Sequence, residues 1–160
     1  MSTPVREQVA AAFAALLEDM TDRNGDAVRV ERGLNTSVSE APLLAVEEGA
    51  ERYADRGYGQ LDVTMTATVY GFVQAPAEEG DPEAAGGALM LAIADLHARV
   101  ARALLAEPRQ LGGLASDIRL VAMAPGIAMD ASVHTGGFTA EYEIDYWVKS
   151  SDPFSQDVGE

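Results

Sequence analysis

The sequence predicts an α+β fold: a single domain in which a twisted, mixed or antiparallel β-sheet carries two main α-helices packed on one face. Residues 59–74 and 137–149 alternate apolar and polar side chains over lengths typical of long strands with one buried face. Between them, residues 88–107 repeat apolar side chains at three- and four-residue spacing, which is typical of a helix covering such a face. We expect the domain to span residues 1–149.

The composition limits the classes of function. The 160 residues include 26 acidic and 11 basic side chains, for a net charge of −15, and no cysteine. Disulfide frameworks, thiolate metal sites and cysteine nucleophiles are therefore excluded. The negative charge opposes free association with nucleic acid, because lysine and arginine drive phosphate binding. It indicates either simple solubility or a surface that repels DNA or meets a basic partner. With no signal peptide and no apolar run long enough to cross a membrane, we expect a cytoplasmic protein.

The first third of the chain predicts one helix and two short strands. Residues 4–22 read as a helix, with Pro4 in the first turn, Ser2 or Thr3 as the N-cap, and Asn24-Gly25 ending it. Residues 27–32 alternate as a short strand with Val28 and Val30 inward. Residues 43–46 form a second short strand, after Pro42. Residues 47–59 are polar, and their pattern determines no conformation.

An acidic segment follows the long strand. Residues 75–87 contain two prolines and three glycines without a large apolar side chain, which predicts an exposed, mobile loop. It is either a solvated tether or a segment that becomes ordered on meeting a partner. Its acids are the candidate partner-binding residues: Glu78, Glu79, Asp81 and Glu83.

The second helix has the clearest pattern in the chain. Its apolar stripe consists of Leu89, Ile93, Leu96, Val100 and Leu104, and Glu107-Pro108 ends it. His97 lies beside the stripe without a second histidine or acid at ligand spacing. We therefore interpret it as a boundary side chain of the core and not as a metal ligand.

The last third predicts two strands and a tail. Residues 117–124 place Ile118 and Leu120 on one face of a strand and Met123 on the other, and Pro125-Gly126 ends it. On the final strand, Glu141, Glu143 and Asp145 project together from the outward face, where acids give solubility and protect an edge. Residues 150–160 read as a polar, acidic tail, with Phe154 as its possible anchor.

No arrangement of residues indicates catalysis. The chain contains no phosphate-binding loop, GxSxG elbow, HExxH helix or paired metal-binding acids, so we expect no catalytic residue, metal or cofactor. One alternative stays open: a small α/β enzyme or ligand-binding domain with a pocket between sheet and helices. In that case His134, Asp130 or Tyr142 would act.

The order of elements resembles the tail terminator proteins of long-tailed bacteriophages, the minor tail protein U-like group. The resemblance covers residues 4–149 and is one of architecture and hydrophobic pattern. It is carried by four segments: VREQVAAAFAALLEDM, AVRVERG with APLLAVEEG, QLDVTMTATVYGFV and ALMLAIADLHARVARALL.

The resemblance implies a structural virion protein without enzymatic activity. Such proteins form a hexameric ring that caps the tail tube at the head–tail junction, stops its polymerisation and offers a surface to the head-completion protein. The major tail tube protein would be a second partner, and DNA would pass through the ring without specific binding. Assembly would take place in the host cytoplasm, away from membranes. The outward acids Glu141, Glu143 and Asp145 are candidates for a lumen or interface face. Another ring-forming tail-completion protein fits the same pattern.

Overall fold

The computed structural model describes residues 2–33, 42–76, 82–129 and 133–156. They form two α-helices and one sheet of five strands, an α+β domain as the sequence predicts. The elements are α1 (Val5–Ala15), β1 (Arg29–Arg32), β2 (Leu43–Gly57), β3 (Gln60–Pro76), α2 (Pro82–Leu104), a 3₁₀ turn (Leu111–Gly113), β4 (Asp117–Met129) and β5 (Val133–Lys149). No helix in the described ranges is long and apolar enough to cross a membrane.

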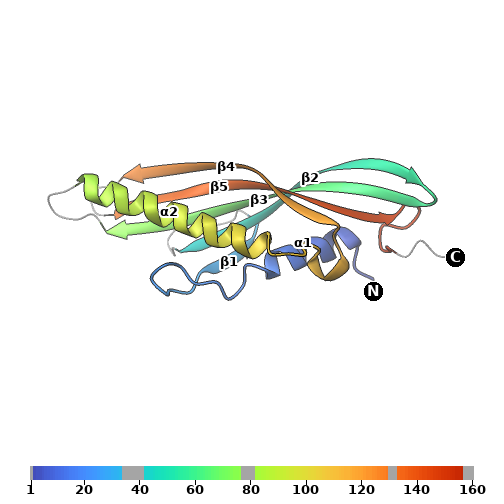
Figure 1. Ribbon diagram of the computed structural model, residues 1–160, viewed down its shortest axis with the longest axis horizontal. Coiled ribbons are helices and arrows are strands. Elements are labelled where there is room, and N and C mark those ends of the chain that lie inside the picture. Colours follow the sequence, from blue (N-terminus) through green and yellow to red (C-terminus); the bar gives the residue numbers. More distant parts are fainter. Residues whose placement is uncertain (1, 34–41, 77–81, 130–132, 157–160) are drawn as a thin grey trace.

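The sheet is open, twisted and elongated, and α2 lies along it (Figure 1). Its strand order is β1-β2-β3-β5-β4. Only β1 and β2 pair in parallel, and the other neighbours are antiparallel. The central pair keeps one register from Gln60 opposite Lys149 to Pro76 opposite Val133. These two 17-residue strands are therefore the frame on which the rest of the chain is arranged.

Both helices pack on the same side of the sheet, which we call the inner face. The apolar stripe predicted for residues 88–107 is confirmed as part of the core, whose central side chains are at most 2 % exposed. Those residues are Phe13, Leu17, Val63, Met65, Val69, Leu89, Ile93, Leu96, Val100, Tyr142 and Ile144. The ring of Phe13 on α1 meets that of Tyr142 on β5 edge-on, with centroids 5.8 Å apart. Burial of this continuous apolar layer is the main stabilising term of the fold.

The helix ends differ from the sequence-based prediction. Helix α1 ends at Ala15 instead of residue 22, because turns follow directly and Asp19 adopts a positive φ of 64°. Pro4 occupies the N-cap position without a side-chain hydrogen bond, so the cap predicted at Ser2 or Thr3 is wrong. Helix α2 ends at Leu104, before Glu107.

The predicted loop 75–87 is too long at both ends. Residues 75–76 belong to β3, and the helix begins at Pro82. Proline suits the first position of a helix, where its missing N–H has no intrahelical partner, and alanine is the best helix former. With Pro82 and the alanines at 84 and 85, α2 therefore begins seven residues before the apolar stripe, whose first residue is Leu89.

Strand β2 is the largest departure from prediction. It continues through the polar residues 47–57 and joins β3 by a two-residue turn at Tyr58-Gly59. We call residues 52–62 the hairpin arm. Residues 52–59 are exposed on both faces of the arm. Because neither face is buried, the sequence of the arm does not alternate apolar and polar side chains. Cross-strand ion pairs accompany the backbone ladder, such as the 2.5 Å contact between Arg56 Nε and Asp62 Oδ2.

Strands β4 and β5 are also longer than predicted. Strand β4 passes through Pro125-Gly126, which an edge strand tolerates because its outer side needs no donor. A register shift between Leu120 and Ala122 reverses the alternation, so Met123 packs against the core instead of facing outward. No strand of the described chain pairs with the outer edge of β4, which carries no charged side chain from Leu120 to Met129.

The segment after β5 is held by its backbone. The amide of Val5 donates to the carbonyl of Pro153 at 3.0 Å, and Lys149 donates to Ser155 at 2.7 Å. The side-chain amide of Gln156 donates to the carbonyl of Leu114 at 2.8 Å. Phe154 is 47 % exposed, so the apolar anchor expected there is wrong.

Candidate functional site: the outer face of the sheet

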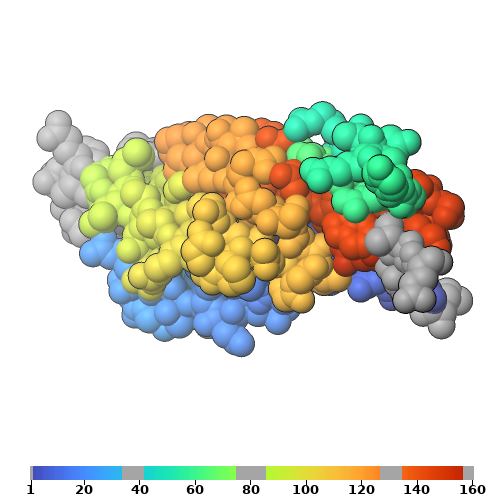
Figure 2. Space-filling view, turned by 45° about the vertical axis from the view of Figure 1, so that its right-hand side comes forward, coloured from blue at the N-terminus to red at the C-terminus, as the bar shows by residue number. Residues whose placement is uncertain are grey.

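The face opposite the helices, which we call the outer face, has no covering layer in the described chain. It carries the even-numbered residues of β3 and the odd-numbered residues of the second half of β5. Thr64, Thr66 and Thr68 are half-buried there, and Thr139 and Glu141 are exposed. At one end of the molecule the hairpin arm (green) stands beside the C-terminal segment (red), as Figure 2 shows.

The structure brings Glu141, Glu143 and Asp145 together on this outer face, where two of the three form ion pairs. Glu143 lies 2.6 Å from the guanidinium of Arg52. Asp145 accepts hydrogen bonds from Arg119, one of them at 3.2 Å. Glu141 is exposed and forms no ion pair within the described residues. The row is therefore less negative than its sequence suggests.

Asp145 is the most strongly held of these acids. Thr64 Oγ1 donates to it at 2.8 Å from the neighbouring strand. The hydrogen bond from Arg119 lowers the pKa of the Asp145 carboxyl, although burial acts in the opposite direction. The same bond raises the pKa of Arg119. Arg119 and Asp145 therefore neutralise each other at this end of the outer face.

The other predicted partner site, the acidic segment before the α2 stripe, falls mostly outside the described residues. Glu78, Glu79 and Asp81 lie outside the described residues. Glu83 belongs to the first turn of α2 instead of a loop, so its assignment to the loop is wrong. Its side chain is not part of the described structure.

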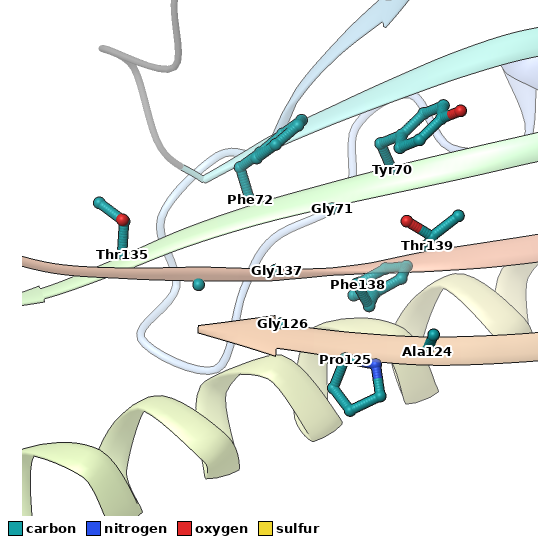
Figure 3. Close-up of a pocket in the computed structure, with 11 residues that line it drawn as sticks. Tyr70, Gly71, Phe72, Ala124, Pro125, Gly126, Thr135, Gly137, Phe138 and Thr139 are labelled. Atoms are coloured by element: carbon teal, nitrogen blue, oxygen red, sulfur yellow. The ribbon is translucent and has the colours of Figure 1, made fainter. Parts of the chain in front are cut away.

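An open groove of about 520 Å³ lies on the outer face near the other end of β3. Tyr70 and Phe72 from β3 stand on one side of it, with Thr139 of β5 beside them and Ala124 of β4 across from them (Figure 3). Its lining contains no charged side chain. Burial, followed by the neighbouring Glu47 carboxylate, raises the pKa of Tyr70.

Glycines form the floor of the groove. Gly137 of β5 pairs with Gly126 of β4. A Cβ at Gly137 would lie 2.0 Å from the carbonyl oxygen of Gly71, so no other residue fits there without a shift of the backbone. On the inner face, the Phe138 ring packs against Gly71, where a Cβ would lie 2.3 Å from it. The glycine pair 136–137 is thus a packing feature of the sheet.

His97 of α2 completes the packing under the groove. Its ring meets that of Phe138 edge-on, with centroids 5.2 Å apart. Its Nε2 is buried without a hydrogen-bond partner in the described chain, and burial lowers its pKa, which favours the neutral ring. The prediction of a boundary side chain is confirmed. Among the described residues, no three His, Asp or Glu side chains gather closely enough to hold a metal ion.

The residues proposed for a catalytic alternative do not form a common site in the described structure. Tyr142 is fully buried on the inner face, and burial raises its pKa to about 12. The groove lies on the opposite face, out of its reach. Asp130 lies outside the described residues, and His134 is described only by its backbone, which pairs with Ala75 and Met129.

Sequence reasoning missed the groove, although one signal was present. Tyr70 and Phe72 occupy the wet face of an alternating strand, where threonine and charged residues otherwise stand. Two aromatics in a row on such a face indicate a surface that contacts something. The glycines opposite them could be recognised as a floor only once the strand pairing was known.

Comparison with known proteins adds little to this geometry. No protein-family model matches the chain, and no curated protein matches it. One similar solved structure has 19 % sequence identity and covers 87 % of this chain and 94 % of its own, with a TM-score of 0.40. A similarity of this size carries no argument about fold or function.

Proposed function

We propose that the protein is a tail terminator of a long-tailed bacteriophage. It forms a ring, expected to be hexameric, on the last tier of the tail tube at the head–tail junction of the virion. There it stops tube polymerisation and offers a surface to the head-completion protein. The observation that supports this proposal is the uncovered outer face, which extends along two 17-residue strands whose inner face is closed by helices.

An uncovered sheet face of this kind suits a subunit that is completed by its neighbours. Its groove is apolar, and the adjoining edge of β4 is uncharged. The outer face therefore offers apolar as well as polar surface for contact. Contiguous apolar surface rimmed by polar residues is typical of protein–protein contact. The tube protein and neighbouring copies of the chain are the partners that the proposal requires.

The charges of the outer face also suit a passage for DNA. The guanidinium groups of Arg52 and Arg119 are engaged by Glu143 and Asp145. A guanidinium already bound to a carboxylate is less available to a phosphate, so the duplex would find few cations to bind. Together with a net charge of −15, this arrangement favours passage without adhesion.

A polymerisation assay tests the function. The purified chain is added to the major tail tube protein of the same genome while tube growth is followed by light scattering and electron microscopy. We expect growth to stop, with added density at one end of each tube and a native mass of six copies for the free or capping species. An unrelated acidic protein at the same concentration is the control. Tubes that grow at an unchanged rate with the chain in excess would contradict the proposal.

The lumen assignment has a separate test, for which Glu141 is the suitable residue because it forms no ion pair in the described chain. Glu141→Lys should leave ring formation intact and slow DNA ejection at low salt, since phosphate contacts strengthen as salt falls. Glu18→Lys, an equal charge change at an exposed site beyond α1, is the matched control. Ejection at the wild-type rate in low salt would remove Glu141 from the lumen.

A further inference from the structure

The tip of the hairpin arm carries an aromatic side chain that is not buried against the rest of the described chain. Tyr58 is fully exposed. It has a positive φ of 57°, between Gly57 at 77° and Gly59 at 78°. A two-residue hairpin turn with positive φ at both positions favours asparagine or aspartate followed by glycine, because a bulky residue is strained there. The tyrosine therefore disfavours the turn slightly and contributes no contact to the folded chain.

The groove on the outer face has a lining that suits an aromatic side chain. Its glycine floor, Gly126 and Gly137, leaves room directly beside the rings of Tyr70 and Phe72 (Figure 3). Its volume, about 520 Å³, lies within the range of protein sites that bind compact groups. Aromatic rings in such a place favour a third ring in an edge-to-face or offset arrangement, and the hydroxyl of a tyrosine can stay in water.

The Tyr58 side chain, which we call the knob, lies far from the groove of its own copy. From Gln60 to Phe72 the chain runs as continuous β3, so the separation is roughly 40 Å at the usual rise of a strand. The β2–β3 turn lies at one end of the sheet (Figure 1), and the residues that line the groove lie toward the other end of β3. The Tyr58 side chain therefore cannot reach its own groove without unfolding the strand.

We infer that the Tyr58 side chain of one copy inserts into the outer-face groove of a second copy of this chain. Because the two surfaces differ, the contact is head-to-tail, and repetition of such a contact closes a ring when the rotation allows. The inference rests on the proposed function in this respect, since a terminator ring requires a contact of this type.

The distribution of charge agrees with a second copy as the occupant. Two chains of net charge −15 repel each other, so a close contact between them costs least where neither surface is charged. Residues 57–60 carry no charge, and neither do the residues that line the groove. Added salt screens the repulsion between the remaining surfaces, so the association should strengthen as salt rises. An interface built on ion pairs would respond in the opposite direction.

Sedimentation velocity on the full chain, at about 1–100 μM, tests the contact. The wild-type chain should assemble, and Tyr58→Ser should weaken self-association on the order of 10-fold or more per contact, because a buried aromatic side chain is lost. Tyr58→Phe should retain it. Ala124→Arg, which places a charged side chain at an exposed wall of the groove, should weaken it as Tyr58→Ser does. Tyr53→Ser is the matched control, since Tyr53 is exposed on the same hairpin but is not at the tip.

Cysteine cross-linking tests the geometry, because the natural chain has no cysteine. One chain carries Gln60→Cys beside the knob, and another carries Thr139→Cys at the groove. Oxidation of the mixture should give the 60–139 disulfide in preference to either homodimer. A mixture of Glu18→Cys with Thr139→Cys is the control. The inference is overturned if the wild-type chain stays monomeric at about 100 μM, if Tyr58→Ser assembles like wild type, or if cross-links are no more frequent than in the control.

These outcomes are distinct from those of the polymerisation assay. Tubes capped equally well by Tyr58→Ser would overturn the knob-and-groove contact and leave the terminator function standing. Self-association through Tyr58 without any effect on tube growth would support the contact and overturn the terminator function.

Discussion

The helix-backed body of the sheet and the hairpin arm share the strand β3 but are held in different ways. In the body, Met65 and Val69 of β3 are fully buried beneath the helices. In the arm, Tyr53 is 62 % exposed, and the ladder is accompanied by surface ion pairs such as Arg56 with Asp62. The body is stabilised by burial of one face, whereas the arm depends on turn geometry and cross-strand pairs. The core thus requires only the helix-backed part of a long strand. The part in the arm is available for contact with a partner.

The strongest test of this contrast is truncation in the body. Ile93→Ala or Leu96→Ala should lower the free energy of unfolding by about 2–5 kcal/mol, because each side chain is fully buried under the sheet. Urea denaturation at pH 7 measures the loss. Arg102→Ala, on the exposed side of the same helix, is the control and should change stability by less than about 0.5 kcal/mol. Equal losses at both kinds of position would mean that the helix packs by another face.

The two buried tyrosines of β5 give a second test. The Tyr142 hydroxyl is buried with no partner in the described chain, so Tyr142→Phe should raise the free energy of unfolding by about 1–2 kcal/mol. The Tyr146 hydroxyl donates to Glu51 at 3.0 Å, so Tyr146→Phe should lower it by about 1 kcal/mol. Burial raises the pKa of both side chains to about 12.

These pKa values predict a loss of stability in base. Between about pH 10, where tyrosine ionises in the unfolded chain, and pH 12, the unfolded state releases protons that the folded state keeps. Stability should therefore fall as pH rises through this window, and Tyr142→Phe should fall less steeply. Thermal denaturation across the window checks this slope, and identical slopes for wild type and variant would contradict it.

A smaller effect is expected where the body meets the arm. Asp145→Asn should cost about 1 kcal/mol at pH 7, because the carboxylate accepts charge-assisted hydrogen bonds from Arg119 but is partly exposed. The pKa of Asp145 is lowered in the folded state, so its contribution is complete above the unfolded value of about 3.9 and disappears as pH falls through the folded value. The difference between variant and wild type should vanish in strong acid, and a constant difference at all pH values would exclude the ion pair as its cause.

The smallest effect is expected in the arm. Arg52→Ala removes a guanidinium whose side chain is 72 % exposed, and its pair with Glu143 should contribute no more than about 0.5 kcal/mol. Denaturation at low and high salt measures it, and the small difference should shrink as salt rises. A loss as large as that of Ile93→Ala would show that the arm belongs to the cooperative core.

The body was predictable from sequence because burial imposes a period on it. The stripe of α2 and the alternation in β3 each determined an element, its inner face and its partners in the core. The arm has no buried face over residues 52–59, so its half of β2 carried no period to recognise. In β4, the register shift after Leu120 reversed an alternation that the sequence pattern continues. Backbone irregularities of this kind leave little trace in a hydrophobic pattern.

The candidate site was predictable only in part. The shared face of Glu141, Glu143 and Asp145 followed from the two-residue period of a strand, but their arginine partners come from β2 and β4, which only the strand order brings close. The groove depends on Gly126 and Gly137 meeting across two strands. Such a meeting is set by register, and register is not encoded in the residues of either strand alone.

The uncharged outer edge of β4 has a consequence for the colloidal behaviour of the protein. Unpaired backbone groups along an apolar strand are a template for another strand, and the ten residues from Leu120 to Met129 include no charged gatekeeper. At neutral pH the long-range repulsion between carboxylates opposes such pairing of free copies. In acid those carboxylates take up protons and the repulsion decreases. We then expect free chains to aggregate through this edge.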